Sequence, residues 1–223
     1  MEIHHISAEH LSIGRVREIL DRHITLALSD DAKRRIVRCR EYLDRKMEHP
    51  ERPIYGITTG FGSLCNISVG HDDLAQLQKN LMMSHACGTG ERVPSEIVRL
   101  MLLLKVQSLS YGHSGVQLAT VERLIDFFNA DILPVVYQQG SLGASGDLAP
   151  LAHMSLPLIG LGEVEYEGRV RPAAEVLAEK GWAPIELQSK EGLALLNGTQ
   201  FMSAYGVWAV MQAQRLSAWA DRI

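Results

Sequence analysis

The chain of 223 residues is 46% hydrophobic and 6% aromatic and carries a formal net charge of −4, which is typical of one soluble domain or of part of a larger one. The mild acidity, without a basic stripe, argues against nucleic acid as a partner, and the longest apolar run, around Leu100 to Leu104, is too short to span a membrane. Three cysteines without metal-ligand spacing, and an N-terminus without the basic start and apolar core of a secretory signal, predict reduced thiols, no bound metal and a cytoplasmic protein.

Capping residues and apolar spacing predict that most of the chain is helical. Ser12 precedes a first short helix, and Ser29 precedes a second in which Ile36, Leu43 and Met47 form one apolar stripe. The arginines and lysines on the rest of that second helix are interpreted as a solvated face. Further helices are predicted at about 74–85, 95–110, 117–129, 148–159 and 173–179, and the helix at 95–110 is apolar nearly all round and expected to be buried.

The last third of the chain combines a predicted hairpin with a long helical pattern. Residues 163–171 alternate polar and apolar side chains around Glu167 and Gly168, which predicts a small exposed β-hairpin. From about residue 191 one long helix is predicted to run to Ile223, where it stops without a cap or a closing glycine. We therefore expect a mainly α fold for residues 1–223, as the N-terminal portion of a longer helical protein.

Residues 55–63 are predicted to form a shaped loop rather than a helix or strand. Gly56, Gly60 and Gly62 fall within seven residues, which disfavours regular structure. Tyr55 opens this loop. Composition alone favours a tyrosine that packs and hydrogen-bonds through its hydroxyl, with a proton-transfer role as the alternative.

Polar residues occur at the ends of two apolar helical segments. Ser84 and His85 end the helix that begins near residue 74, and a lone histidine there is usually a satisfied core residue. Asn197 and Gln200 lie three apart and are expected to share one helix face, where two carboxamides need hydrogen-bond partners. The partners could be protein groups, in a structural amide pair, or a bound ligand, and the sequence leaves both alternatives open.

Residues 140–150 carry the most distinctive chemistry of the chain. The triplet Ala144-Ser145-Gly146 precedes a predicted helix start, with Asp147 as the N-cap. Because Gly146 has no Cβ, a tight turn can press its nitrogen onto the carbonyl carbon of Ala144, which closes a five-membered ring with loss of water. Loss of a second water across the Ser145 side chain leaves an exocyclic methylene, an electrophile that unmodified side chains do not supply.

Two simpler interpretations of this loop remain. Ala-Ser-Gly triplets are common in loops, and glycines before a helix N-terminus can cradle a phosphate. The loop lacks the Gly-Lys-Ser/Thr ending of a P-loop, and Gly140, Gly143 and Gly146 are not in dinucleotide-binding spacing. We therefore expect no bound nucleotide.

The loops at 55–63 and 140–150 and the segment Asn197-Gly198-Thr199-Gln200 together resemble the histidine and phenylalanine ammonia-lyase family. The resemblance extends from the first helices to Ile223. It implies a long central helix bundle and a methylidene-imidazolone prosthetic group formed autocatalytically from Ala144, Ser145 and Gly146, without metal or nucleotide. It also implies a homotetramer whose active sites combine several subunits.

The resemblance also implies roles for the polar residues. Tyr55 matches a proton-transfer residue in a loop shaped by Gly60 and Gly62, and Asn197, with Gln200 nearby, matches a residue that contacts the substrate carboxylate. Ser84-His85 matches a dyad that is Ser-His in histidine-specific members, and a polar pair can hydrogen-bond an imidazole ring. The implied reaction is non-oxidative elimination of ammonia from L-histidine to give urocanate, in histidine degradation. A lyase or aminomutase for another aromatic amino acid, and an inactive fragment with an uncyclised triplet, remain alternatives.

Overall fold

A computed structural model describes residues 2–48, 57, 74–141 and 146–223, and helices dominate it, as predicted. The helices are α1 (Ile13–Asp21), α2 (Asp30–Glu48), α3 (Leu74–His85), α4 (Ser95–Ser110), α5 (Leu118–Asn129), α6 (Leu148–Ser155), α7 (Ala173–Lys180), α8 (Glu191–Leu196) and α9 (Gln200–Ala220). A 3-10 turn, η3 (Leu156–Ile159), continues α6, so the helix predicted at 148–159 is confirmed with a tighter last turn.

Short strands form three small sheets at the edges of the helical body. The strands are β1 (Ile3–Ile6), β2 (Thr25–Leu28), β3 (Thr89–Arg92), β4 (Leu133–Pro134), β5 (Tyr137–Gln139), β6 (Glu163–Tyr166) and β7 (Arg169–Pro172). Strand β1 pairs in parallel with β2, and β3 pairs antiparallel with β5. The predicted hairpin is confirmed as β6 and β7, joined through Glu167 and Gly168, whose φ angles of 52° and 70° are those of a type I′ turn. Strand β4 extends this hairpin to three strands.

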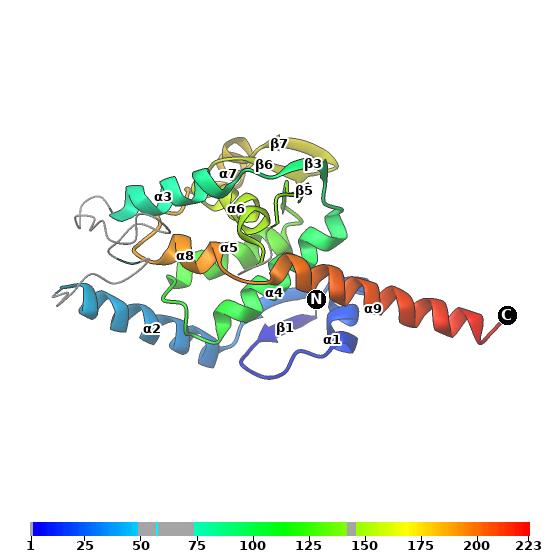
Figure 1. Ribbon diagram of the computed structural model, residues 1–223. Helices are drawn as coiled ribbons and strands as arrows, with labels where there is room; N and C mark the ends of the chain where they lie inside the picture. The colour runs from blue at the N-terminus through cyan, green and yellow to red at the C-terminus, as the bar shows by residue number, and fades with distance from the viewer. Residues whose placement is uncertain (1, 49–56, 58–73, 142–145) are drawn as a thin grey trace.

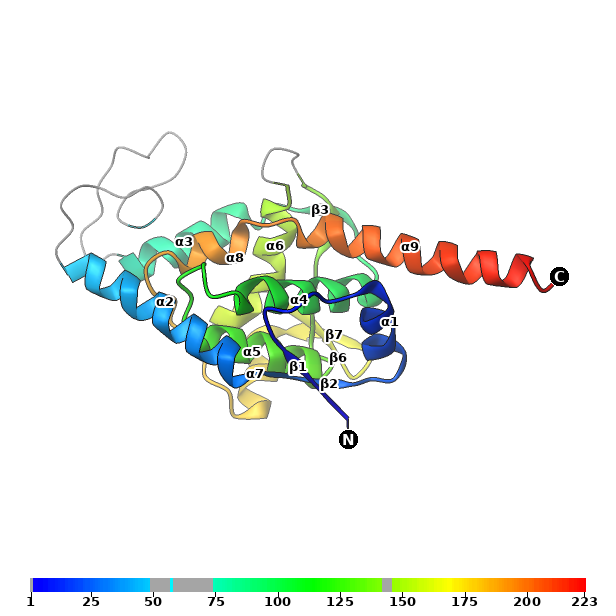
Figure 2. The same cartoon turned by 90° about the horizontal axis from the view of Figure 1, so that it is seen from below.

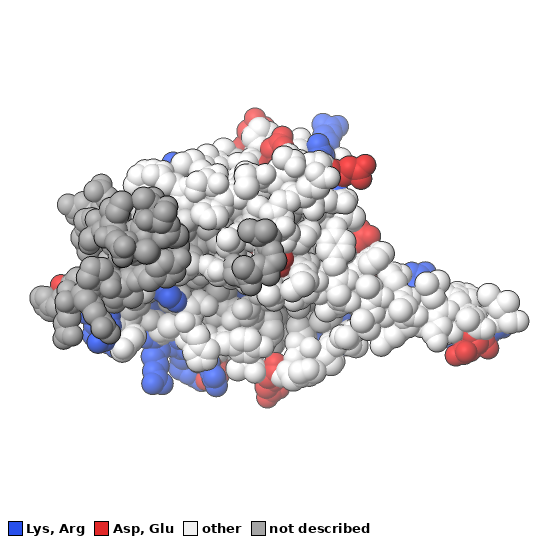
Figure 3. All heavy atoms as spheres, viewed as in Figure 1, with Lys and Arg blue, Asp and Glu red and all other residues white. Residues whose placement is uncertain are grey.

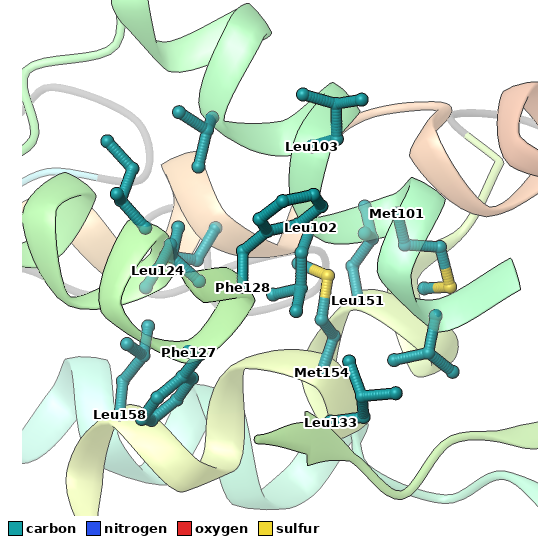
Figure 4. Packing of buried hydrophobic residues seen from close by; sticks show 14 of the residues in the cluster. Met101, Leu102, Leu103, Leu124, Phe127, Phe128, Leu133, Leu151, Met154 and Leu158 are labelled. Atoms are coloured by element: carbon teal, nitrogen blue, oxygen red, sulfur yellow. The ribbon is translucent and has the colours of Figure 1, made fainter. Parts of the chain in front are cut away.

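The core surrounds α4, which contacts α2, α5 and α9 (Figures 1 and 2). Successive residues Leu100 to Leu103 are all fully buried, which confirms that this helix is buried on most sides. In Figure 4 apolar side chains of α4 and α5 meet those of α6, β4 and η3; the labelled residues are Met101, Leu102, Leu103, Leu124, Phe127, Phe128, Leu133, Leu151, Met154 and Leu158. Each such side chain contributes roughly 1.5–3 kcal/mol by leaving water. This cluster therefore holds α4, α5, α6, β4 and η3 together.

The predicted helix starts are confirmed, but one part of the predicted solvated face is not. Ser12 Oγ accepts a hydrogen bond from Arg15 N, at 3.2 Å, at the start of α1. The charged residues of α2 include Arg40, which is buried and donates to the carbonyl oxygens of Gly115 and Ser189 at 2.8 and 2.9 Å. Arg40 therefore links α2 to two loops by hydrogen bonds, because those loops present carbonyl groups that need donors.

The single long helix predicted from residue 191 is instead two helices. Asn197 ends α8 with an extended backbone, at φ −81° and ψ 129°, and α9 begins only at Gln200. The expectation that Asn197 and Gln200 share one helix face is therefore wrong. A Cβ on Gly198 would overlap the Gln200 side chain, so the break depends on glycine at this position.

Helix α9 leaves the body of the molecule along its length (Figures 1 and 2). Phe201 and Ala204 near its start are buried, whereas residues 213–223 are exposed. The projecting part is largely uncharged in Figure 3. Among the residues that the structure describes, none belongs to a helix with the length and hydropathy needed to cross a membrane.

Candidate active site

The end of the 140–150 loop lies against the break between α8 and α9. Gly146 and Gly198 form an isolated parallel β-bridge, so the last residue of the triplet touches the neighbour of Asn197. Gly146 has a φ of +94°, a conformation that favours glycine, and a Cβ there would come within 3.3 Å of the Gly198 carbonyl oxygen. Gly146 is therefore held against Gly198 in a conformation that a residue with a side chain would rarely adopt. Ala144 and Ser145 lie outside the described residues, so the ring itself stays a prediction.

Asp147 occupies the N-cap position of α6, but its side chain caps α9. Its Oδ2 accepts a hydrogen bond from Met202 N at 3.0 Å, in the first turn of α9, and its Oδ1 accepts from Ser141 Oγ at 3.2 Å. The prediction that this side chain caps its own helix is therefore wrong. A carboxylate at a helix start satisfies an orphan N–H and interacts favourably with the helix dipole. Asp147, 1% exposed, thus ties the loop to the start of α9.

Lys105 of α4 binds the other side of the same break. Its Nζ donates hydrogen bonds to Ala194 O at 2.8 Å and to Asn197 O at 3.1 Å. The side chain is fully buried, and this burial lowers its pKa to about 7, although the Asp147 carboxylate opposes the shift. Sequence reasoning assigned no role to this lysine. The signal that marks it is a charged residue within an otherwise apolar helical run.

The Ser84-His85 dyad ends α3 with both side chains turned back onto that helix. Ser84 Oγ donates to Leu81 O at 3.1 Å, and His85 Nδ1 lies 2.9 Å from the same oxygen. Because a carbonyl oxygen only accepts, Nδ1 carries the proton. In the neutral ring Nε2 is then the acceptor, which suits it to receive an N–H such as that of an imidazole.

The chain that follows the dyad is joined to the start of the 140–150 loop. Thr89 of β3 pairs with Gln139 of β5, and a Cβ on Gly140 would come within 3.0 Å of Gly88 Cα. His153 of α6 reinforces this contact, because its Nε2 accepts the Gly88 N–H at 3.0 Å. Burial lowers the pKa of His153, which favours the neutral ring that this bond requires. His153 was not assigned from the sequence.

The two carboxamides differ in their surroundings. Asn197 is exposed, and its Nδ2 donates to Leu193 O at 3.3 Å, so its Oδ1 is left to other donors. Gln200 is buried, and its Oε1 has no hydrogen-bond partner among the described residues. Since the Gln200 side chain lies against Gly198, this oxygen is an acceptor beside the residue that pairs with Gly146.

The structure therefore brings together three predicted motifs in their described parts: the Ser84-His85 dyad, the 140–150 loop and the segment 197–200. Helices α3, α6 and α8, which carry or adjoin them, contact one another. Within residues 2–48, 57, 74–141 and 146–223, no group of three or more His, Cys, Asp and Glu side chains is arranged to hold a metal ion. The remaining predicted site residues lie outside the described part of the chain and stay predictions: Tyr55, Gly60, Gly62, Ala144 and Ser145.

The sequence model of the aromatic amino acid lyase family matches residues 11–223. The chain belongs to this family. It is 56% identical over 194 residues to a histidine ammonia-lyase of Deinococcus radiodurans, covering 87% of this chain and 37% of that protein. A histidine ammonia-lyase of Symbiobacterium thermophilum is 48% identical over 212 residues, covering 95% of this chain and 42% of the relative. The chain thus spans about two fifths of the length of these relatives.

Solved structures place the fold in the same family. The histidine ammonia-lyase of Trypanosoma cruzi matches with a TM-score of 0.86 and 36% identity, covering 97% of this chain and 41% of that one. The tyrosine aminomutase of Streptomyces globisporus matches with a TM-score of 0.87 and 34% identity, covering 96% and 40% of the two chains. The helical lyase fold is therefore confirmed.

Proposed function

We propose that the protein carrying this chain eliminates ammonia from L-histidine without oxidation and yields urocanate, in the cytoplasm. The observation that carries the proposal is the pairing of Gly146 with Gly198, which brings the end of the Ala144-Ser145-Gly146 triplet to Asn197. A methylidene-imidazolone formed from this triplet would supply an electrophile for the substrate amine and so a better leaving group. The similarity to two histidine ammonia-lyases, at 56% and 48% identity, supports histidine as the substrate.

Residues of the chain itself bind the substrate and transfer the proton. His85, with its proton on Nδ1, offers Nε2 to the N–H of the substrate imidazole, and Ser84 shares the Leu81 carbonyl that orients it. Asn197 donates the second N–H of its Nδ2 to the substrate carboxylate, and Gln200 accepts a hydrogen bond beside it. Tyr55 takes or relays the proton from the substrate β-carbon. The N-terminus of α6 follows Gly146 directly, and its partial positive charge stabilises negative charge that develops there.

A product assay on the intact protein that carries this chain tests the reaction. We expect urocanate from L-histidine, and a protein mass lower by two water molecules than the sequence predicts. Ser145→Ala has no hydroxyl to lose, so it is expected to keep the second water and to lose turnover. Full turnover by Ser145→Ala, or an unmodified mass in an active preparation, would contradict the proposal.

Substrate choice is the second point, because the chain is also similar to a tyrosine aminomutase. His85→Leu removes the imidazole reader, and we expect turnover of histidine to fall by roughly tenfold or more while turnover of phenylalanine or tyrosine rises. The measurement is kcat/KM for the three amino acids. Unchanged histidine turnover, without gain on the other two, would remove His85 from substrate selection. Assembly as a homotetramer remains part of the proposal and is carried by the family resemblance.

A further inference from the structure

A fully buried lysine is an unusual way to close a helix. The last carbonyls of any α-helix lack intrahelical donors, and water or a capping group normally binds them. At the end of α8 the donor is Lys105, which arrives from α4 and bonds the carbonyls of Ala194 and Asn197. The neighbouring carboxylate of Asp147 binds the start of α9. One ionisable side chain therefore holds each side of the break that contains Gly198.

We propose that Lys105 is a positioning residue of the active site, which acts through the Asn197–Gly198 backbone to hold Gly146 in its turn. The inference rests on the proposed function for its chemical consequence. Ring closure joins the Gly146 nitrogen to the Ala144 carbonyl carbon and releases water, so it needs Gly146 to be held in place. Gly146 is contacted by Ser141, whose Oγ donates to Gly146 O at 3.4 Å, and by Gly198, and Lys105 fixes the residue immediately before Gly198.

A lysine is suited to this task in a way that an apolar residue is not. Both the ammonium group and the neutral amine carry enough N–H groups to reach the two carbonyls. Removing them takes the lysine donor from two carbonyl oxygens in part-buried hydrogen bonds, and losing the donor of such an acceptor is costly. In its protonated form the lysine also balances Asp147, which is the charged group that acts on Lys105 from the adjoining α6 segment.

Hydrogen exchange of the chain tests the placement without reference to activity. Lys105→Met keeps the length and apolar stem of the side chain and removes its donors. We expect the backbone amides of 146–148 and 198–203 to exchange about tenfold faster or more in this variant, measured by mass spectrometry under native conditions.

Arg40→Met is the matched control. Arg40 is also a buried cation that binds two carbonyl oxygens, including that of Ser189 just before α8, but it lies away from the Gly146–Gly198 pair. We expect this variant to speed exchange around residues 115 and 189 and to leave 146–148 and 198–203 unchanged. Equal effects of the two substitutions at the Gly146–Gly198 pair, or no effect of Lys105→Met there, would overturn the inference.

A second measurement links the placement to chemistry. In the intact protein, we expect the fraction of Lys105→Met molecules that lose two waters to be about tenfold below that of Arg40→Met at matched folded fraction. Faster exchange with an undiminished two-water loss would overturn the positioning role. If the wild-type protein never loses water, the proposed function fails, whereas the exchange experiment still decides where Lys105 acts.

Discussion

Two bases, the buried Lys105 and the partly buried His153, connect the free energy of unfolding of this chain to pH. Burial lowers the pKa of each in the folded chain, and each becomes an ordinary solvated base after unfolding. The unfolded chain therefore binds more protons than the folded chain between the two pKa values of each group. In that range stability rises with pH.

For Lys105 this range extends from about 7 to the ordinary value of 10.5. We expect the free energy of unfolding to increase as pH rises through this window, and to lose that contribution as pH falls to about 7. Urea unfolding of wild type and Lys105→Met at both ends of the window measures it. Above the window the difference in unfolding free energy between the two proteins should no longer change with pH. A Lys105 ¹³Cε resonance that titrates near 10.5 would contradict this prediction.

For His153 the free energy of unfolding falls on the acid side of its ordinary pKa. Its folded pKa lies below 6.5, so the stability that it contributes is present above 6.5 and is lost as pH falls further. Protonation also removes the acceptor of the Gly88 N–H. We expect the acid-induced fall in Tm to be smaller in His153→Gln than in wild type. His10→Gln, at an exposed histidine, is the control and should follow the wild-type curve.

At the scale of elements, one carboxylate joins two helices. Asp147 precedes α6 and caps α9 through Met202 N, so its loss should loosen the start of α9. We expect Asp147→Ala to lower the free energy of unfolding by about 1–3 kcal/mol, since a buried charge-assisted hydrogen bond is lost. Urea unfolding measures this change. Asp30→Ala, at an exposed acid in the first turn of α2, should cost much less, and an equal cost would show that the effect is not specific.

The elements themselves were largely predictable from local chemistry. The Ser12 cap, the Glu167-Gly168 turn and the apolar faces of α2 and α5 depend on neighbouring residues, and periodicity captures such features. The break at Asn197 was missed because the helical pattern on either side is continuous. What interrupts it is a tertiary pairing with Gly146, far away in the chain.

The same limit applies to the site. Gly146 and Asn197 could be assigned to a candidate site because their motifs are local and specific, and their roles stay predictions. Lys105 and His153 act through hydrogen bonds to backbone groups of distant segments, and such bonds leave no periodic trace in a sequence. Arg40 was misplaced for the same reason, because a charged residue on a basic helix face looks solvated until its carbonyl partners are known.

At the scale of the whole molecule, the outer part of α9 presents apolar side chains to solvent. Leu216 is 69% exposed and Trp219 is 51% exposed, on a helix that leaves the body (Figure 1). Exposed apolar surface of this kind promotes association. We expect the chain to self-associate, and the double variant Leu216→Ser, Trp219→Ser to shift it toward monomer with little change in the free energy of unfolding. Sedimentation velocity at several concentrations measures the shift. Unaltered association would place the contact elsewhere.

The pairing of Gly146 with Gly198 also bears on when the protein matures. During synthesis Gly146 leaves the ribosome well before Gly198, with the hairpin, α7 and α8 still to be made between them. Gly146 therefore cannot pair with Gly198 until that later segment has been made. On the proposed chemistry, dehydration of the triplet would be a late event that follows the docking of α9, and the mass of a nascent chain would then record how far its folding has advanced.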